Sequence, residues 1–231
     1  MKPVTEVPEA VRPVHRRLAK KYRLGFETVT VGGKTLEVLG VADLEPLIGG
    51  RDVFANPREF PFWVKIWEAS VVLADFLAAL PPDPGRRLLE LGAGLGVTGL
   101  AGAAFGHRVT LTDYQEEILD FGRVSAAVNG CADRAAFEVV DWLAPRDLGR
   151  FDVLLGSEVL FNEQFFEPLL GVFRRYLAPG GVVYLAHDAR RRSLGQFLPL
   201  CERDYRIGMK RRRLRTEDET LDVLLTRLEP R

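Results

Sequence analysis

The sequence contains little cysteine or histidine, which limits the chemistry open to it. It has two cysteines, Cys131 and Cys201, and three histidines among 231 residues. The cysteines lie too far apart for the Cys-x-x-Cys spacing of a metal site, and a chain of this length can fold without disulfides. No serine–histidine–aspartate or cysteine–histidine motif frames His15, His107 or His187. We therefore expect no metal site, two free thiols and no catalytic histidine.

The sequence also lacks an excess of charge and any long apolar run. Lysine and arginine total 32, as do aspartate and glutamate, which argues against a surface that binds phosphate backbones throughout. Two basic runs, 15–23 and 210–215, leave an RNA partner open, although Glu217-Asp218-Glu219 is expected to neutralise part of the second. No segment has the apolar core of a signal peptide or the length to span a bilayer. We expect a cytoplasmic monomer without a membrane partner.

Strands and helices alternate after residue 85. Strands are predicted at 87–91, 108–112, 136–140, 151–156, 182–186, 205–213 and 221–228, and helices at 97–105, 115–128, 165–177 and 193–201. Apolar strands separated by helices indicate a parallel sheet covered on both faces. The last two strands have no helix between them, which indicates an antiparallel edge hairpin. The expected fold is α/β and Rossmann-like, with a seven-stranded, mainly parallel sheet.

The preceding residues predict an extension of different composition. A basic segment at 11–23 favours a short helix, and two β-favouring runs within 26–39 meet at Gly32-Gly33, which is a hairpin signal. An irregular stretch follows at 43–61, where glycine and proline lie near both ends. We therefore expect an N-terminal helix, a hairpin and a loop.

A long apolar segment joins this extension to the alternating region. Apolar residues at helical spacing predict one helix over 62–80, and Pro81-Pro82 ends it. We expect Phe62, at its start, to pack in the core. The predicted organisation is an N-terminal extension, 1–61, and a main domain, 62–231.

A glycine-rich motif, LLELGAGLGVTGL at 88–100, leads from a predicted strand into a helix. Its backbone amides can approach a ligand closely where a Cβ would collide. One interpretation is the G-x-G-x-x-G pattern of dinucleotide-binding proteins, at 94–99. The other is an acidic residue, Glu90, followed by glycine at Gly92, Gly94 and Gly96.

Side chains at three strand ends favour the second interpretation. The carboxylate of Glu90 suits the ammonium and sulfonium groups of S-adenosylmethionine better than a pyrophosphate. Asp113 closes the next strand, where a carboxylate can accept hydrogen bonds from both ribose hydroxyls. Asp141-Trp142 closes the third, with an acceptor for the adenine amino group and an indole to pack on its ring. These residues predict S-adenosylmethionine as the cofactor.

Three segments resemble one protein family. These are IWEASVVLA at 66–74, Asp141-Trp142, and SEVLF at 157–161, which matches an [Asp/Glu]-x-x-[Tyr/Phe] motif. Together with the glycine loop they resemble the class I seven-β-strand methyltransferases, and more narrowly the family-sixteen branch, which contains many protein-lysine methyltransferases. The resemblance covers about 62–228.

This resemblance implies a set of site residues. Glu158 and Phe161 are expected to be catalytic, because a carboxylate can orient a lysine amine while an aromatic face attracts a cationic nitrogen. The side chain of Trp67 is expected beside the cofactor. The residues expected to bind the cofactor are Trp67, Glu90, Gly92, Ala93, Gly94, Gly96, Asp113, Tyr114, Asp141, Trp142 and Ser157.

The expected activity is transfer of a methyl group from S-adenosylmethionine to a nitrogen, such as a protein lysine, by direct displacement. A small-molecule amine or an RNA remains an alternative acceptor. A protein that binds S-adenosylmethionine or NAD without catalysis is a further alternative. The sequence has no (Asp/Asn/Ser)-Pro-Pro-(Tyr/Phe) motif after the fourth strand of the main domain, so adenine and glutamine amides rank lower as acceptors.

Overall fold

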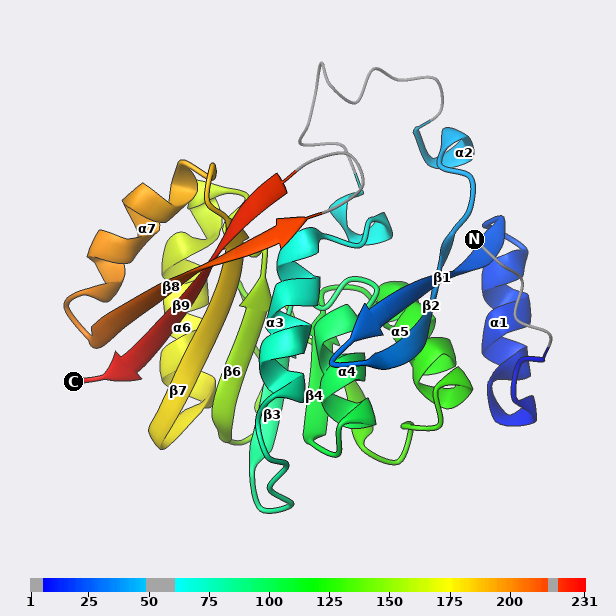
Figure 1. Ribbon diagram of the computed structural model, residues 1–231, viewed down its shortest axis with the longest axis horizontal. Coiled ribbons are helices and arrows are strands. Elements are labelled where there is room, and N and C mark those ends of the chain that lie inside the picture. The colour runs from blue at the N-terminus through cyan, green and yellow to red at the C-terminus, as the bar shows by residue number, and fades with distance from the viewer. Residues whose placement is uncertain (1–5, 49–60, 216–219) are drawn as a thin grey trace.

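The computed structural model describes residues 6–48, 61–215 and 220–231. An N-terminal lobe comes first and a large mixed sheet with helices follows (Figure 1). The lobe comprises η1 (Glu9–Val11), α1 (Arg12–Ala19), β1 (Leu24–Val31), β2 (Lys34–Val41) and α2 (Glu45–Ile48). The helices of the main part are η3 (Phe62–Val64), α3 (Glu68–Ala78), α4 (Val97–Ala104), α5 (Glu116–Val128), η4 (Glu163–Phe165), α6 (Phe166–Tyr176) and α7 (Ser193–Cys201).

The main sheet has seven strands in the order β5-β4-β3-β6-β7-β9-β8. They are β3 (Arg87–Leu91), β4 (Arg108–Asp113), β5 (Ala135–Val139), β6 (Phe151–Ser157), β7 (Leu177–Asp188), β8 (Tyr205–Arg215) and β9 (Thr220–Pro230). Strands β3 to β7 are parallel, whereas β9 pairs antiparallel with both β7 and β8. This confirms the predicted α/β fold and its antiparallel edge. The chain reverses its direction of travel across the sheet between β3 and β6, where open α/β sheets bind ligands.

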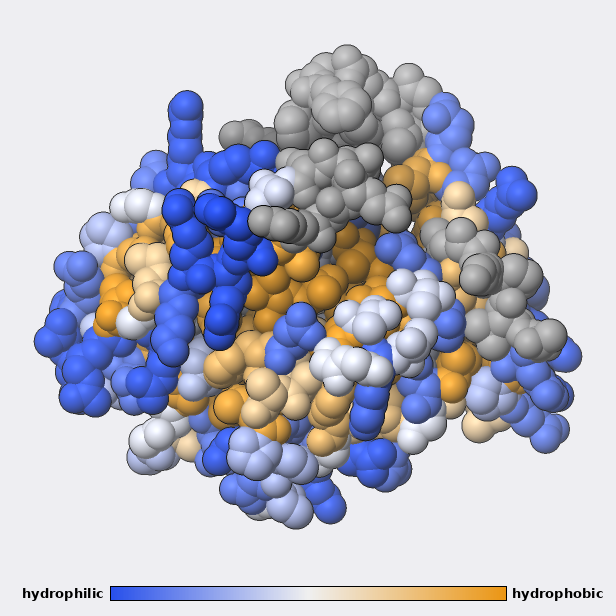
Figure 2. Space-filling view, viewed as in Figure 1, coloured by the Kyte–Doolittle hydropathy of each residue, from blue (hydrophilic) through white to orange (hydrophobic). Residues whose placement is uncertain are grey.

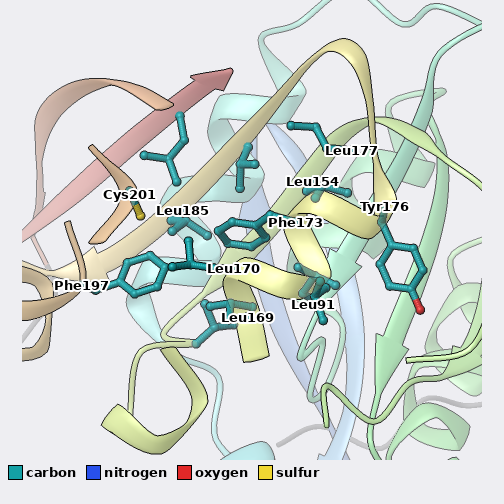
Figure 3. Packing of buried hydrophobic residues seen from close by; sticks show 14 of the residues in the cluster. Leu91, Leu154, Leu169, Leu170, Phe173, Tyr176, Leu177, Leu185, Phe197 and Cys201 are labelled. Carbon is teal, nitrogen blue, oxygen red and sulfur yellow. The ribbon is translucent and has the colours of Figure 1, made fainter. Parts of the chain in front are cut away.

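Helices cover both faces of this sheet. On one face, α3 packs its Leu73 and Leu77 against strand residues such as Leu88 and Leu155. On the other face, α6 and α7 bury a second cluster, in which the Phe173 and Phe197 rings contact each other (Figure 3). Both layers are needed because parallel strands are apolar on both sides.

The N-terminal hairpin packs on helices and makes no pairing with the main sheet. Gly32 and Gly33 have φ of 53° and 78°, as its tight turn requires. The amide of Leu39 donates a hydrogen bond to Ser125 Oγ at 2.8 Å, which fastens β2 to α5. Apolar residues of β1, β2, α4 and α5 form one buried cluster. The expected helix and hairpin are therefore present, and they cover the outer side of α4 and α5.

The single helix predicted over 62–80 is wrong. The structure has η3 and α3 instead, separated by a break at which Lys65 and Trp67 adopt extended backbone angles. The Trp67 indole donates to the Phe62 carbonyl at 2.9 Å, and the Trp67 carbonyl accepts from the Ser70 amide at 2.9 Å. These bonds satisfy the carbonyl groups of Phe62 and Trp67, which a continuous helix would have paired within itself. Trp67 is therefore the N-cap of α3. Most of the loop predicted at 43–61 and of the turn predicted at 215–220 lies outside the described residues.

We predict that Phe197→Ala lowers the free energy of unfolding by roughly 3–5 kcal/mol, because it leaves a cavity between α7 and α6. Leu200→Ala in the same helix should change it by less than about 0.5 kcal/mol. Phe197 is 0% exposed, whereas Leu200 is 41% exposed. Urea unfolding followed by circular dichroism measures both variants. Equal losses would contradict the packing described for α7.

Candidate active site

A cavity of about 510 Å³ opens at the edge where β3, β4 and β6 end. Its volume lies in the usual range for small-molecule sites. Five chain segments form its walls: the η3–α3 region, the glycine loop, the end of β4, the residues after β5 and the residues after β6. The sequence-predicted residues on these walls are Trp67, Gly92, Ala93, Gly94, Gly96, Asp113, Tyr114, Asp141, Trp142, Ser157, Glu158 and Phe161. The structure thus brings together segments that are far apart in the sequence.

The glycine loop turns β3 sharply into α4. Gly92, Gly94 and Gly96 have φ of 63°, 54° and 83°, a region that side chains strongly disfavour. A Cβ on Gly92 would lie 3.3 Å from Val159 Cγ1 and 3.4 Å from the Trp142 ring. The loop therefore keeps its backbone open to the cavity only with glycine at these positions.

Glu90 is the one predicted cofactor residue that does not line the cavity. Its side chain is 1% exposed, and Oε2 accepts a hydrogen bond from the Gly99 amide at 2.9 Å. A Cβ on Gly99 would lie 2.5 Å from that oxygen, so glycine is required there. Burial raises the pKa of Glu90 to about 8, although the hydrogen bond from Gly99 opposes the shift. Glu90 thus connects the strand before the glycine loop to α4 through a buried hydrogen bond.

Asp113 ends β4 beneath the loop and lines the cavity. Its Oδ2 accepts from the Gly94 amide at 2.9 Å and its Oδ1 accepts from the Tyr114 amide at 2.8 Å. Burial raises the pKa of Asp113 to about 6, against the effect of these two hydrogen bonds. Each carboxylate oxygen has a further lone pair, which can accept from a ligand hydroxyl.

The residues after β5 form a wall that is apolar with one polar group. Asp141 is exposed, and its Oδ1 accepts from the Leu143 amide at 2.9 Å. The Trp142 ring stands edge-to-face on Phe165, with centroids 5.9 Å apart. Val140 adds a buried side chain to the same wall. A flat aromatic ligand with an amino group fits this combination.

Glu158 occupies a strained position just after β6. It has φ of 53°, a conformation that costs a non-glycine residue about 1–2 kcal/mol. Its side chain is nearly buried; Oε1 accepts from the Asp188 amide at 2.6 Å, and Oε2 forms an ion pair with Arg191. Burial raises the pKa of Glu158, while the charge of Arg191 opposes this shift. The chain thus holds a carboxylate rigidly at the cavity wall.

Aromatic rings surround this carboxylate. Phe161 is exposed and stacks on Phe62, with centroids 6.2 Å apart, and Phe62 in turn contacts Trp67 at 6.0 Å. The expectation that Phe62 packs in the core is therefore wrong, because it is half-buried and lines the cavity. The break before α3 explains this, since it turns η3 toward the strand ends.

Sequence reasoning missed other residues at the site. Arg191, which pairs with Glu158, also lies over the Trp67 ring at 5.9 Å. The arginine run at 190–192, directly after the fifth strand of the main domain, was the available signal. His187 is fully buried and does not line the cavity. Within the described ranges, no cluster of histidine, cysteine, aspartate or glutamate could hold a metal ion.

A family model described as lysine methyltransferase matches residues 62–204 of the sequence. The chain belongs to this family. The match spans the η3–α3 region, the glycine loop and the carboxylate after β6, which together form the cavity. Methyltransferases of this family use S-adenosylmethionine as the methyl donor. The family match therefore favours the S-adenosylmethionine interpretation of the glycine loop over the dinucleotide interpretation.

Individual relatives act on different side chains. EEF1A lysine methyltransferase 3 of Mus musculus is 31% identical over 162 residues, covering 63% of this chain and 68% of that protein. Histidine protein methyltransferase 1 homolog of Dictyostelium discoideum is 31% identical over 150 residues, covering 62% of this chain but only 48% of that protein.

Solved structures agree on the fold. The ribosomal protein L11 methylase of Lactobacillus delbrueckii subsp. bulgaricus superposes with a TM-score of 0.54 at 22% identity, covering 70% of this chain and 79% of that chain. At this identity the likeness concerns the fold alone. In the parts of the chain that the structure describes, no helix is long and apolar enough to cross a membrane.

The cavity residues fit S-adenosylmethionine. The open glycine loop would hold its amino-acid portion, Asp113 its ribose, and Asp141 with Trp142 its adenine. When bound, the cofactor supplies an electrophilic methyl group on a sulfonium sulfur. These individual contacts remain predictions.

We predict that Glu90→Gln removes a pH-dependent loss of stability. The folded-state pKa of Glu90 is raised from 4.5 to about 8, so the folded protein retains a proton that the unfolded chain releases between these values. Stability should therefore fall as pH rises through this window, by at most about 1.4 kcal/mol per pH unit. A glutamine side chain cannot ionise. In urea unfolding, the free energy of unfolding of the variant should therefore rise relative to that of the wild type between pH 5 and 8. A difference in the free energy of unfolding that stays constant across this pH range would contradict the raised pKa of Glu90.

Proposed function

We propose that this chain methylates the side-chain amine of a lysine in a protein substrate. The observation that carries the proposal is the rigid carboxylate of Glu158, which stands at the cavity wall among Phe161, Phe62 and Trp67. The lysine activity in the name of the Mus musculus relative supports the same acceptor.

The chemistry follows from the charge of the acceptor. A lysine has a reference pKa near 10.4 and is almost entirely protonated at neutral pH, whereas only its neutral form can attack a methyl carbon. Glu158 can bind the ammonium as it arrives and orient the amine after the proton leaves. The rings of Phe161 and Trp67 attract the cationic form and the methylated product. Alignment within a closed site contributes much of the rate.

A carboxylate favours this acceptor over a histidine. The imidazole group has a reference pKa near 6.5 and is mostly neutral at pH 7, so it gains less from an anionic partner. The ion pair with Arg191 fixes the Glu158 carboxylate but leaves lone pairs for a second donor. The proposal retains the expectation of a cytoplasmic, monomeric enzyme.

We expect Glu158→Gln to lower kcat at least tenfold, because the neutral amide loses its attraction for the ammonium. The matched control is Glu167→Gln, an exposed residue in the first turn of α6, which should leave kcat unchanged. Transfer of a labelled methyl group to lysine-containing peptides and to lysate proteins measures the rate. Mass spectrometry then identifies the modified residue.

Two results would contradict the proposal. One is a methyl group found only on histidine, on arginine or on RNA. The other is a Glu158→Gln enzyme with full kcat, provided that its melting temperature and its affinity for S-adenosylhomocysteine match those of the wild type.

A further inference from the structure

A second cavity, of about 560 Å³, adjoins the first. It lies between the N-terminal end of α3, the residues after β7 and the start of β9. Both cavities share Lys65, Trp67, Glu158 and Phe161 in their walls. The carboxylate proposed to orient the amine thus stands where the two cavities meet. A lysine side chain that enters through the second cavity would reach Glu158 without crossing the glycine loop, which lines only the first cavity.

Cations outnumber carboxylates on the walls of this second cavity. Three of its cations have carboxylate partners, whereas Arg192 is exposed and pairs with no carboxylate among the described residues. The pairs are Lys65–Glu68 at 3.8 Å, Arg190–Asp188 at 2.6 Å, and Arg191–Glu158. The cavity therefore presents one positive charge that the described part of the chain leaves uncompensated.

Strand β8 extends this positive charge beyond the cavity. Arg212 lies opposite Val223 of the cavity wall, and Lys210 lies opposite Leu225. Residues directly opposite in an antiparallel pair share a face, so both cations lie on the α3 side of the sheet. Figure 2 shows strongly hydrophilic side chains in this region, beside a hydrophobic surface.

The other face of β8 is different. Arg211 and Arg213 point to that face, and both pair with Asp222. In the described segments, no carboxylate pairs with Arg212 or Lys210, and residues 217–219 lie outside those segments. The cations that the described residues leave unpaired are therefore on the side of the strand that borders the second cavity.

We propose that Arg192, Lys210 and Arg212 form a basic patch that binds an acidic segment of the substrate protein, next to the lysine to be methylated. This inference rests on the proposed function. The lysine would enter the second cavity while the chain beside it crosses the patch. An extended chain rises about 3.3 Å per residue, so Arg212 and Lys210 match two carboxylates spaced two residues apart.

A peptide fits this surface better than an RNA does. Glu68, Glu158 and Asp188 stand in the wall beside the patch, each paired with a cation, so the wall offers no continuous positive track for a backbone that carries a charge at every nucleotide. Separate carboxylates on a peptide can meet the three cations and avoid these anions. The anions in turn attract the lysine itself.

The test compares two peptides of the same length around one lysine, one with glutamates two and four residues from it and one with glutamines there. The wild type should methylate the acidic peptide with a kcat/KM at least tenfold higher. The double variant Lys210→Gln/Arg212→Gln should reduce this ratio to about threefold or less. Its rate on the glutamine peptide should be unchanged. The matched control, Arg211→Gln on the opposite face of β8, should keep the full ratio.

A charge swap strengthens the test. Arg212→Glu should reverse the preference, favouring a peptide with arginines in place of the glutamates. A wild type without preference, or a preference that survives in the double variant, would overturn the basic patch. RNA binding at 0.15 M salt that depends on Lys210 and Arg212 would assign the patch to RNA instead. Failure to methylate either peptide, with methyl transfer only to other residue types, would refute the proposed function itself.

Discussion

One buried hydrogen bond, from the Gly99 amide to the Glu90 carboxyl, holds the active-site edge of the sheet together. It connects the end of β3 to the first turn of α4 through the protein interior. The Thr112 hydroxyl donates to the Glu90 carbonyl at 2.6 Å, which adds β4 to the same arrangement. The bond can exist only because residue 99 has no side chain, and the turn between its partners can close only with glycine. The contact proposed for the amino-acid portion of the cofactor depends on this fixed loop.

The site concentrates carboxyl groups in places where water is scarce. Burial raises the pKa of Glu90, Asp113 and Glu158, because desolvation disfavours the charged form of each carboxyl group. Backbone amides support the first two, and an arginine supports the third. Asp113 and Glu158, which line the cavities, gain most from a cationic ligand. S-adenosylmethionine and a lysine ammonium both carry positive charge, and they would approach this cluster from two adjoining cavities.

Much of this site could be predicted from the sequence, because its residues follow strands. Parallel strands end at one edge, so Asp113, Asp141 and Glu158 had to lie close together. The position of Glu90 outside the cavity could not be predicted from its charge, because it depends on the direction of its side chain. In β3, Leu89 and Leu91 face α6 while Leu88 faces α3, and the period of two places Glu90 with Leu88, under the helices.

Other features depended on contacts that no local pattern encodes. The apolar spacing at 62–80 resembles one helix, and it breaks because the Trp67 indole bonds back to the Phe62 carbonyl. That break brings Phe62 to the cavity. Arg191 reaches Glu158 across 33 positions of sequence, and the fold alone determines that approach.

The most direct measurement is calorimetric titration of S-adenosylhomocysteine and of NAD into the wild type and Asp113→Asn. We predict that S-adenosylhomocysteine binds the wild type in the micromolar range and the variant at least tenfold more weakly, because Asp113 is assigned to the ribose. NAD should bind neither protein. Binding of NAD alone, or equal affinity of S-adenosylhomocysteine for both proteins, would contradict the cofactor site described at the glycine loop.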